Sequence, residues 1–501
     1  MIPSASPNSP LLARHFFVAT AVILASKLIL SWWLPLTGDE AYFVVWGMFP
    51  DYGYYDHPPL VGWWLALAQL LSAHPTVLRL LGIVASSTPA LLVYLIYRRM
   101  DETKARLLSL MLLSFPLYFI GILVTTDSGL ILFGLLSITA CWRGLQTQRA
   151  GWFLLSGVLL GLAFLSKYFA VLIGIGLAAH LLLFERRNRW ALPVIILGTL
   201  PFIALNIYWN SQNCWYNVMF NVVNRHSGDR GDYFNIPVYL ITLIYLFTPW
   251  LMWSMWRQRK NIIDGVRKHR LGLFISTSII PLALFFVVSP SARIGLHWLA
   301  VFIPGLVLVS FFLSTQRLHR CTLYMVCFGA AHVLLLFTLL ATPIDLFKDQ
   351  RRYADVVFHL KPHALSALTA TYDESWWFFT SSYSRSAIMT YYSDRYFGVF
   401  GAGSHYGRQD DLLTDFRDMH GENMIFLPRR GTAELDPLLP FFASLTVRPV
   451  EIHGAVFEVI EAKGFDYPAY RETILERVRD RYYQFPNWLP MGQCRFTERY
   501  F

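Results

Sequence analysis

The chain has 501 residues and a formal net charge of +10 at pH 7, with 55% hydrophobic and 15% charged residues. Soluble domains carry about 25% charged residues, so this composition excludes an ordinary soluble enzyme and a disordered chain. The basic residues lie in short clusters between apolar runs, which is typical of membrane topology rather than of a basic face that binds nucleic acid. The five cysteines are too few for a disulfide framework.

Apolar runs long enough to cross a bilayer, for which about 20 residues suffice, recur over the first two thirds of the chain. The first run is too long for a cleaved signal peptide, and no small-x-small cleavage site follows it. Lys167 interrupts the run 152–184, which predicts a tight hairpin of two short spans; the alternative is one long span with a costly buried lysine. The sequence thus predicts eleven spans, at 13–35, 76–97, 107–124, 128–143, 152–166, 168–184, 191–209, 236–256, 271–289, 296–314 and 321–342.

The loops between these runs predict the orientation. By the positive-inside rule the loops rich in Lys and Arg are cytoplasmic, so the N-terminus is inside and, after an odd number of spans, the C-terminal segment is outside. Seventeen basic residues lie on the rich side: Arg98, Arg99, Lys104, Arg106, Arg143, Arg149, Arg186, Arg187, Arg189, Arg257, Arg259, Lys260, Arg267, Lys268, Arg270, Arg317 and Arg320. Before residue 343 the opposite loops hold four: Lys167, Arg225, Arg230 and Arg293.

Residues 343–501 differ from the rest of the chain because charges become frequent and apolar runs shorten. Alternating strand and helix patterns predict a small extracytoplasmic α/β domain, next to a polytopic membrane domain at 1–342. We expect strands at 365–371, 395–400, 423–428, 444–450 and 454–461, and helices at 375–392, 409–419 and 468–483.

The first outer loop, residues 36–75, contains no Lys or Arg and is rich in aromatic residues. Such a loop is expected to lie on the membrane as short amphipathic helices. It carries two acidic groups, Asp39-Glu40 and Tyr55-Asp56-His57. The plain alternative is that the first pair starts a helix and the second forms a rigid turn before two prolines. Unpaired acids near hydrocarbon are costly, which favours a functional role.

Other polar residues lie at the same predicted level, at the starts or ends of spans. They are Asp127 after two threonines, Lys167 at the hairpin tip, Arg225, Arg293 and His297. Each of them alone fits interfacial snorkelling or a helix cap. Together, acids and cations at the outer face suit transfer of a group from an anionic lipid, because a departing phosphate needs cationic partners and the acceptor hydroxyl needs a carboxylate base.

Asp39-Glu40, Tyr54-Tyr55-Asp56-His57-Pro58-Pro59 and Thr125-Thr126-Asp127 together resemble the bacterial relatives of protein O-mannosyltransferases, namely glycosyltransferase family 39 and the aminoarabinose-to-lipid-A transferases. The resemblance covers about residues 1–342 and the layout of a C-terminal extracytoplasmic domain. It implies the GT-C fold of a multi-pass α-helical membrane protein, a polyprenyl-phosphate sugar donor and an active site at the outer membrane face.

The resemblance also implies roles for individual residues. Asp39 matches the catalytic base, and Asp127 matches a second active-site acid that is expected to face the same cavity. Asp56 and His57 match a Glu-Lys pair whose Lys helps to hold phosphate, and His57 departs from that pattern. Adjacent helical residues point about 100° apart. We therefore expect Asp39 to act as the base and Glu40 to cap or pair elsewhere.

Because His57 replaces a lysine, Lys167 and Arg293 are expected to hold the phosphate and to approach each other. The predicted substrate-binding residues are Glu40, Tyr55, Asp56, His57, Lys167, Arg225, Arg293 and His297. No cofactor is assigned with certainty. Candidate ligands of a divalent metal ion are Asp56, His57 and His297, which share suitable chemistry but no fixed spacing.

The leading hypothesis is a glycosyltransferase of the bacterial inner membrane that moves a sugar from a polyprenyl-phosphate donor to a hydroxyl of a glycolipid such as lipid A, a glycan or a protein, with inversion. The alternative is a transporter or flippase of the same lipid, although no inverted repeat and no cluster of polar residues at mid-span supports it. A scaffold that presents the C-terminal domain is a further alternative. Of the cysteines, Cys214 and Cys494 are predicted outside, where pairing and free thiols are both open.

Overall fold

A computed structural model describes residues 10–224, 232–427, 433–484, 486, 489–490 and 492–501. The chain forms two compact units, each built from three stretches of sequence. The first unit comprises Met1–Trp33, Thr76–Ala204 and Gly228–Thr338, and the second comprises Leu34–Pro75, Leu205–Ser227 and Leu339–Phe501. The first outer loop is thus grouped with the C-terminal segment, whereas the sequence prediction assigned it to the membrane domain.

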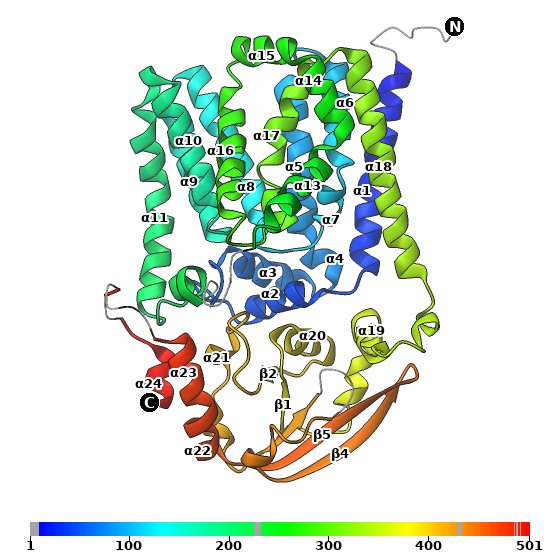
Figure 1. Cartoon of the computed structure of the whole chain (residues 1–501), viewed down its shortest axis with the longest axis vertical. Coiled ribbons are helices and arrows are strands. Elements are labelled where there is room, and N and C mark those ends of the chain that lie inside the picture. The colour runs from blue at the N-terminus through cyan, green and yellow to red at the C-terminus, as the bar shows by residue number, and fades with distance from the viewer. Residues whose placement is uncertain (1–9, 225–231, 428–432, 485, 487–488, 491) are drawn as a thin grey trace. The chain divides into compact units, whose positions relative to one another are not determined.

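The first unit is helical, and Figure 1 shows its long helices running side by side with α15 across one end. Its α-helices are α1 (Pro10–Trp33), α5 (Leu80–Tyr97), α6 (Glu102–Leu113), α7 (Pro116–Ile120), α8 (Thr126–Thr147), α9 (Ala150–Ser166), α10 (Ala170–Leu183), α11 (Ala191–Ser211), α13 (Asn235–Phe247), α14 (Pro249–Arg257), α15 (Arg259–Lys268), α16 (Gly272–Val288), α17 (Ile303–Val307) and α18 (Thr315–Ala341), preceded by the short α4 (Pro75–Leu78). The 3₁₀ turns are Arg186–Asn188, Leu296–Leu299 and Leu308–Phe312.

Helices pack closely in this unit where side chains are small. A Cβ on Gly157 of α9 would lie 2.1 Å from the carbonyl oxygen of Ile195 on α11. Small residues at such contacts let backbones approach and gain van der Waals energy, which drives helix association in lipid.

The structure is helical in every one of the eleven predicted spans, several of them short or broken. By length and composition, five helices of the described chain could cross a membrane (α1, α5, α8, α11 and α18), or up to seven if the bent pairs α13–α14 (75°) and α15–α16 (118°) each count as one. The hairpin prediction is confirmed, because α9 ends at Ser166, Lys167 caps it, and α10 begins at Ala170. The exact number of spans stays a prediction.

The second unit contains a five-stranded sheet of order β2-β1-β3-β5-β4. Strands β1, β2 and β3 are parallel, and β5 pairs antiparallel with β3 and β4. In the parallel part Phe378 pairs with Phe397 and with Ile425. The strands are β1 (Trp376–Thr380), β2 (Phe397–Val399), β3 (Asn423–Phe426), β4 (Phe442–Ile452) and β5 (Ala455–Phe465).

Helices complete the second unit, and α20 connects the parallel strands β1 and β2 (Figure 1). A core of aromatic residues, including Phe379, Phe400 and Phe465, fills the sheet region. The α-helices are α2 (Gly38–Met48), α3 (Leu60–Leu71), α12 (Tyr216–Val218), α19 (Tyr353–Leu360), α20 (Tyr383–Ser393), α21 (Asp410–Leu413), α22 (Tyr467–Tyr470), α23 (Glu476–Tyr482) and α24 (Arg495–Tyr500). The 3₁₀ or π turns are Met219–Asn224, Ile344–Phe347, Pro362–Leu368, Phe416–Met419, Leu439–Phe441 and Arg471–Leu475.

Two predictions for the C-terminal segment are wrong in detail. The predicted strand 365–371 is largely a 3₁₀ helix that starts at Pro362, because a short apolar run does not distinguish a strand from a buried helix. The predicted helix 375–392 begins instead with strand β1, whose Trp-Trp-Phe-Phe-Thr sequence has high β propensity.

Candidate functional site

The start of α2 separates the two adjacent acids of the first loop. Thr37 and Glu40 form a capping box: the Glu40 backbone N–H donates to Thr37 Oγ1, and the Thr37 backbone N–H donates to Glu40 Oε2 at 3.1 Å. Glu40 is fully buried, whereas Asp39 is exposed. As predicted, Glu40 caps the helix and leaves Asp39 as the accessible acid.

A tyrosine of the C-terminal segment holds Asp39. Tyr383, at the start of α20, donates from its hydroxyl to Asp39 Oδ1 at 3.1 Å. Burial, followed by the nearby charge of Asp39, raises the pKa of Tyr383, so its hydroxyl stays protonated and acts as a donor. The ring of Tyr383 packs edge-to-face on Tyr42 and lies against Gly407, where a Cβ would come within 2.1 Å of the Tyr383 ring.

Asp56 is buried and bound by neutral donors. Its Oδ1 accepts from the Tyr42 hydroxyl at 3.0 Å, and its Oδ2 accepts from the Gly407 N–H at 3.2 Å. Burial raises the pKa of Asp56 to about 6; the two hydrogen bonds oppose this shift, and the charge of Asp39 adds to it. These contacts hold the Asp56 carboxyl in place, and its predicted role in substrate binding stays a prediction.

The neighbours of Asp56 differ in exposure. Tyr55 is fully buried, donates from its backbone N–H to Gln409 Oε1 at 2.8 Å, and packs near Tyr216. Its predicted contact with substrate stays a prediction. His57 is half-buried, and its ring centroid lies 6.3 Å from that of Trp46.

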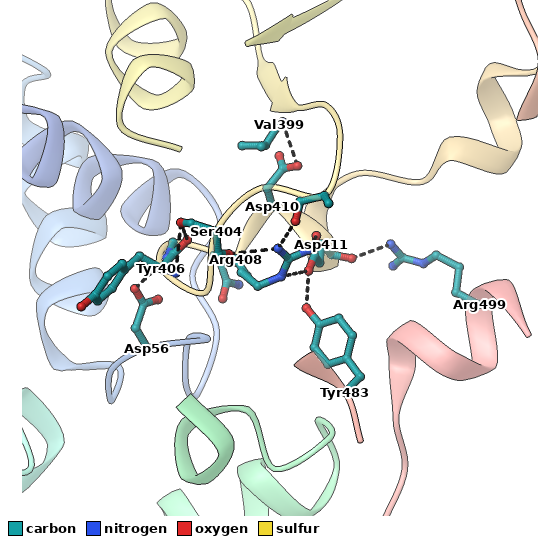
Figure 2. A network of polar contacts seen from close by, with 12 residues as sticks. Asp56, Val399, Ser404, Tyr406, Arg408, Asp410, Asp411, Tyr483 and Arg499 are labelled. Atoms are coloured by element: carbon teal, nitrogen blue, oxygen red, sulfur yellow. Dashed lines mark hydrogen bonds and ion pairs between the residues drawn. The ribbon is translucent and has the colours of Figure 1, made fainter. Parts of the chain in front are cut away.

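Two adjacent acids, Asp410 and Asp411, hold the loop that carries Gly407 and Gln409. Arg408 makes two bonds to Asp411, at 2.7 and 3.1 Å, and Tyr483 donates to the same carboxylate (Figure 2). Asp410 accepts from the Val399 N–H at 2.9 Å, and burial raises its pKa to about 6 against its hydrogen bonds. This network holds the loop in the geometry that Asp56 and Tyr383 require.

The segment after α11 is joined to other parts of the second unit by a disulfide and by hydrogen bonds from a side-chain amide. Cys214 and Cys494 form a disulfide, which settles the question that the sequence left open. The Asn217 side-chain amide donates to the carbonyls of Tyr54 and Tyr55. The first outer loop is thereby anchored to two distant stretches of the chain.

In the first unit, Asp127 and Lys167 form a buried ion pair. Lys167 Nζ lies 2.8 Å from both carboxylate oxygens of Asp127, and the two side chains are only 9% and 12% exposed. Asp127 lies in the first turn of α8, which Thr125 caps. The Ser166 hydroxyl donates to the Thr126 carbonyl at 2.7 Å and so ties the end of α9 to the start of α8.

Two further predicted residues lie on the segment before α17. His297 Nε2 lies 3.9 Å from Asp127 Oδ2, and the His297 side chain is 61% exposed. Trp298 packs edge-to-face on Phe169, which holds this segment near the hairpin tip. Arg293 is exposed; its predicted approach to Lys167 stays a prediction.

Two predictions receive no support. Arg225 lies outside the described residues. Among the residues that the structure describes, no group of three or more His, Cys, Asp or Glu side chains could hold a metal ion, so the candidate ligands Asp56, His57 and His297 do not form such a set.

Sequence reasoning missed several polar residues. Lys27, in the middle of α1, is fully buried and donates to the Ser86 hydroxyl at 3.0 Å. Arg79, within a predicted span, is also fully buried and donates to the Ser31 carbonyl. Intramembrane cations mark functional sites by default, and this rule could have identified both. No local pattern distinguishes Tyr383.

Comparisons of the sequence with known proteins find relatives that are glycosyltransferases by name. A family model described as "Dolichyl-phosphate-mannose-protein mannosyltransferase" matches residues 56–209. The chain is 25% identical over 294 residues to the lipid A galacturonosyltransferase RgtD of Rhizobium johnstonii, which covers 54% of this chain and 59% of that protein. It is 26% identical over 231 residues to undecaprenyl phosphate-alpha-4-amino-4-deoxy-L-arabinose arabinosyl transferase 2 of Proteus mirabilis, covering 41% and 42%. The chain thus aligns with about half the length of these curated relatives.

Two solved structures match nearly the whole fold. Both are of ArnT from Cupriavidus metallidurans, at 14% identity. The apo structure has a TM-score of 0.65 and covers 90% of this chain and 98% of ArnT. The structure bound to undecaprenyl phosphate has a TM-score of 0.60 and covers 89% and 97%. The chain is therefore a multi-pass helical membrane protein with the GT-C fold of ArnT, and the resemblance to family 39 and aminoarabinose transferases that its loop motifs predicted is confirmed.

Proposed function

We propose that the protein is a glycosyltransferase that moves a sugar from a polyprenyl-phosphate donor to an acceptor hydroxyl. The observation that carries this proposal is the contrast between two adjacent acids at the start of α2. Glu40 takes part in the helix cap, whereas Asp39 is exposed and accepts a hydrogen bond from Tyr383. The names of the two relatives specify lipid A and an undecaprenyl phosphate sugar. They support a lipid-linked donor and a glycolipid acceptor such as lipid A.

Asp39 serves as the base in this proposal. Its carboxylate takes the proton of the acceptor hydroxyl, whose oxygen forms a bond to the anomeric carbon of the sugar. The bond from that carbon to the phosphate oxygen breaks, and the electron pair leaves with the polyprenyl phosphate. A single displacement of this kind inverts the anomeric centre. Phosphate leaves without a proton, so the second acid of ordinary glycosidases is not required.

The cations of the first unit suit the departing phosphate. Lys167 is held by Asp127 in one geometry, and a lysine that is fixed in advance stabilises developing negative charge without reorganisation. The pair has no net charge by itself. We therefore assign the additional positive charge to the exposed Arg293. His297, whose Nε2 lies 3.9 Å from Asp127 Oδ2, is assigned to the same end of the unit as a polar neighbour.

We extend the proposal to topology and location. The eleven helical segments span the bacterial inner membrane with the N-terminus in the cytoplasm, residues 343–501 lie outside, and transfer occurs at the outer face. The basic residues of the loops support this orientation. The Cys214–Cys494 disulfide supports it too, because disulfides persist in oxidising compartments.

The test is transfer by the purified full-length protein in lipid, with undecaprenyl phosphate 4-amino-4-deoxy-L-arabinose or galacturonic acid as donor and lipid A as acceptor. Asp39→Asn keeps the shape of the side chain and should lower the rate roughly 10²-fold or more, with donor binding kept. The matched control is Asp373→Asn, whose carboxylate likewise accepts a bond from a hydroxyl, that of Ser375; this variant should keep normal turnover.

Two outcomes would contradict the proposal. Normal turnover by Asp39→Asn would remove Asp39 from the role of base. Movement of the donor lipid between leaflets that is equally fast in wild type and Asp39→Asn, with no sugar transfer in either, would establish the flippase alternative.

A further inference from the structure

A cavity of about 520 Å³ lies in the first unit, where α5 and α8 end and α15 turns into α16. Its volume falls within the range of about 300–1,000 Å³ that small-molecule sites occupy. The buried residues Tyr97, Trp142 and Leu271 contribute to its wall. None of the residues that line it is acidic; they are 95–100, 142, 143, 146 and 268–271.

Positive charge around this cavity is not compensated. Arg98, Arg99, Arg143 and Lys268 are exposed, and within the described part of the chain none of them forms an ion pair. The fifth cation, Arg270, is bound by Glu185 at 2.6 and 2.8 Å. Four free cations therefore surround one concave surface, and like charges this close repel one another unless an anion joins them.

Two local features describe the wall of this cavity. Arg270 follows the end of α15 with a φ of +54°, and the Leu271 N–H donates to the Val266 carbonyl at 3.0 Å, which is a common way for a helix to end. The Arg270 side chain is bound by Glu185. The indole N–H of Trp142 is buried and donates no hydrogen bond to any described residue. The Arg143 guanidinium lies 5.3 Å above the ring of the same Trp142.

The place of the cavity along α8 indicates which ligand reaches it. Asp127 lies in the first turn of α8 and Arg143 near its end, which at 1.5 Å per residue separates them by about 24 Å. That distance is close to the hydrocarbon thickness of a bilayer, about 30 Å. The cavity thus lies at the opposite membrane interface from the Asp127–Lys167 pair. Leu95 and Met100 in its lining are exposed and give acyl chains an apolar edge.

We propose that this cavity binds a phosphate-bearing anion, with the phosphodiester headgroup of an anionic membrane phospholipid as the occupant that the apolar edge favours. Basic pockets between membrane helices on the cytoplasmic side bind such headgroups. Free phosphate shares the same chemistry and is the other source. The site is separate from the proposed transfer reaction and does not depend on it.

Native mass spectrometry of the full-length protein in detergent, titrated with dioleoyl phosphatidylglycerol, tests the site. Arg98→Gln/Arg143→Gln should weaken retention of this lipid about 30-fold, because each basic residue near an anionic lipid surface contributes roughly a factor of five. The control is Arg257→Gln/Arg259→Gln, which removes the same charge from two arginines that lie over Trp253 and Trp256 outside the cavity. It should bind like wild type.

Three further arms complete the experiment. Phosphatidylcholine should be retained equally weakly by all variants. Displacement of phosphatidylglycerol by millimolar inorganic phosphate would support the site with a soluble anion as its occupant. If the double variant is not monodisperse, Arg143→Gln alone should still weaken binding about fivefold. Equal retention of phosphatidylglycerol by the cavity variant and the control variant would overturn the proposal.

Discussion

Asp127 in the first unit and Asp56 in the second are almost equally buried, at 8% and 7% exposure, but their charges are handled differently. Asp127 is neutralised by the ammonium group of Lys167. Asp56 receives only neutral donors, a phenol and a backbone N–H. In an ion pair the attraction of the opposite charge offsets much of the cost of burying each charged group. Neutral donors offset this cost only in part.

Breaking the ion pair should have the largest effect. Lys167→Met leaves Asp127 as a buried carboxylate without a cation, which should destabilise the protein by about 3–5 kcal/mol. Thermal unfolding of the protein in detergent measures this. The double variant Lys167→Met/Asp127→Asn should recover much of the loss. A double variant as unstable as Lys167→Met alone would show that the pair is not the cause.

Asp56 should respond to pH instead. Its carboxyl keeps its proton up to about pH 6 in the folded protein, against a usual pKa of 3.8. The folded state therefore binds more protons between these values, and the contribution of Asp56 to stability, about 2–3 kcal/mol, is lost as pH rises from about 4 through 6. The melting temperature of wild type relative to Asp56→Asn should fall over this range. A constant difference would contradict the shift.

Gly407 provides one of the two neutral donors to Asp56, through its backbone N–H. It has a φ of +64°, and an added Cβ would lie 2.1 Å from the Tyr383 ring, so Gly407→Ala should cost about 1–3 kcal/mol and disturb both Asp56 and Tyr383. Gly421 has a φ of +82° with no atom near its Cβ position. Gly421→Ala therefore isolates backbone strain and should cost only about 1 kcal/mol. Equal losses in thermal unfolding would argue against the close contact.

Tyr383→Phe is the mildest change. It removes the hydroxyl that holds Asp39 and keeps the ring, so we expect a rate of sugar transfer lower by about 5- to 10-fold, the worth of one partly exposed hydrogen bond. Tyr391→Phe is the control on the same helix, because it removes a hydroxyl that donates to the Ala73 carbonyl. Transfer rates that do not differ between the two variants would remove Tyr383 from the positioning of Asp39.

Helical periodicity and helix-start chemistry predicted what is local. The hairpin at Lys167 and the contrast between a capping Glu40 and an exposed Asp39 both follow from neighbouring residues. The alternation of strands in the C-terminal segment was also readable, apart from the run at 365–371, where strand and helix have the same apolar pattern.

Partners distant in sequence could not be predicted. Tyr383 lies 344 residues from Asp39, and Gly407 lies 351 residues from Asp56; neither shows a motif. The partner of Asp127 was missed for another reason. Lys167 was assigned to phosphate together with Arg293, because the sequence shows that outward-facing basic residues are scarce and cannot show which acid each of them will meet.

The Cys214–Cys494 disulfide joins two residues 280 positions apart in the chain, one just after α11 and the other at the start of α24. A protease that cuts once anywhere inside this interval leaves two fragments that remain one molecule until a reductant is added. On a non-reducing gel the nicked protein would migrate as a single species. The covalent ring therefore guards against separation of the fragments after cleavage, independently of any non-covalent contact.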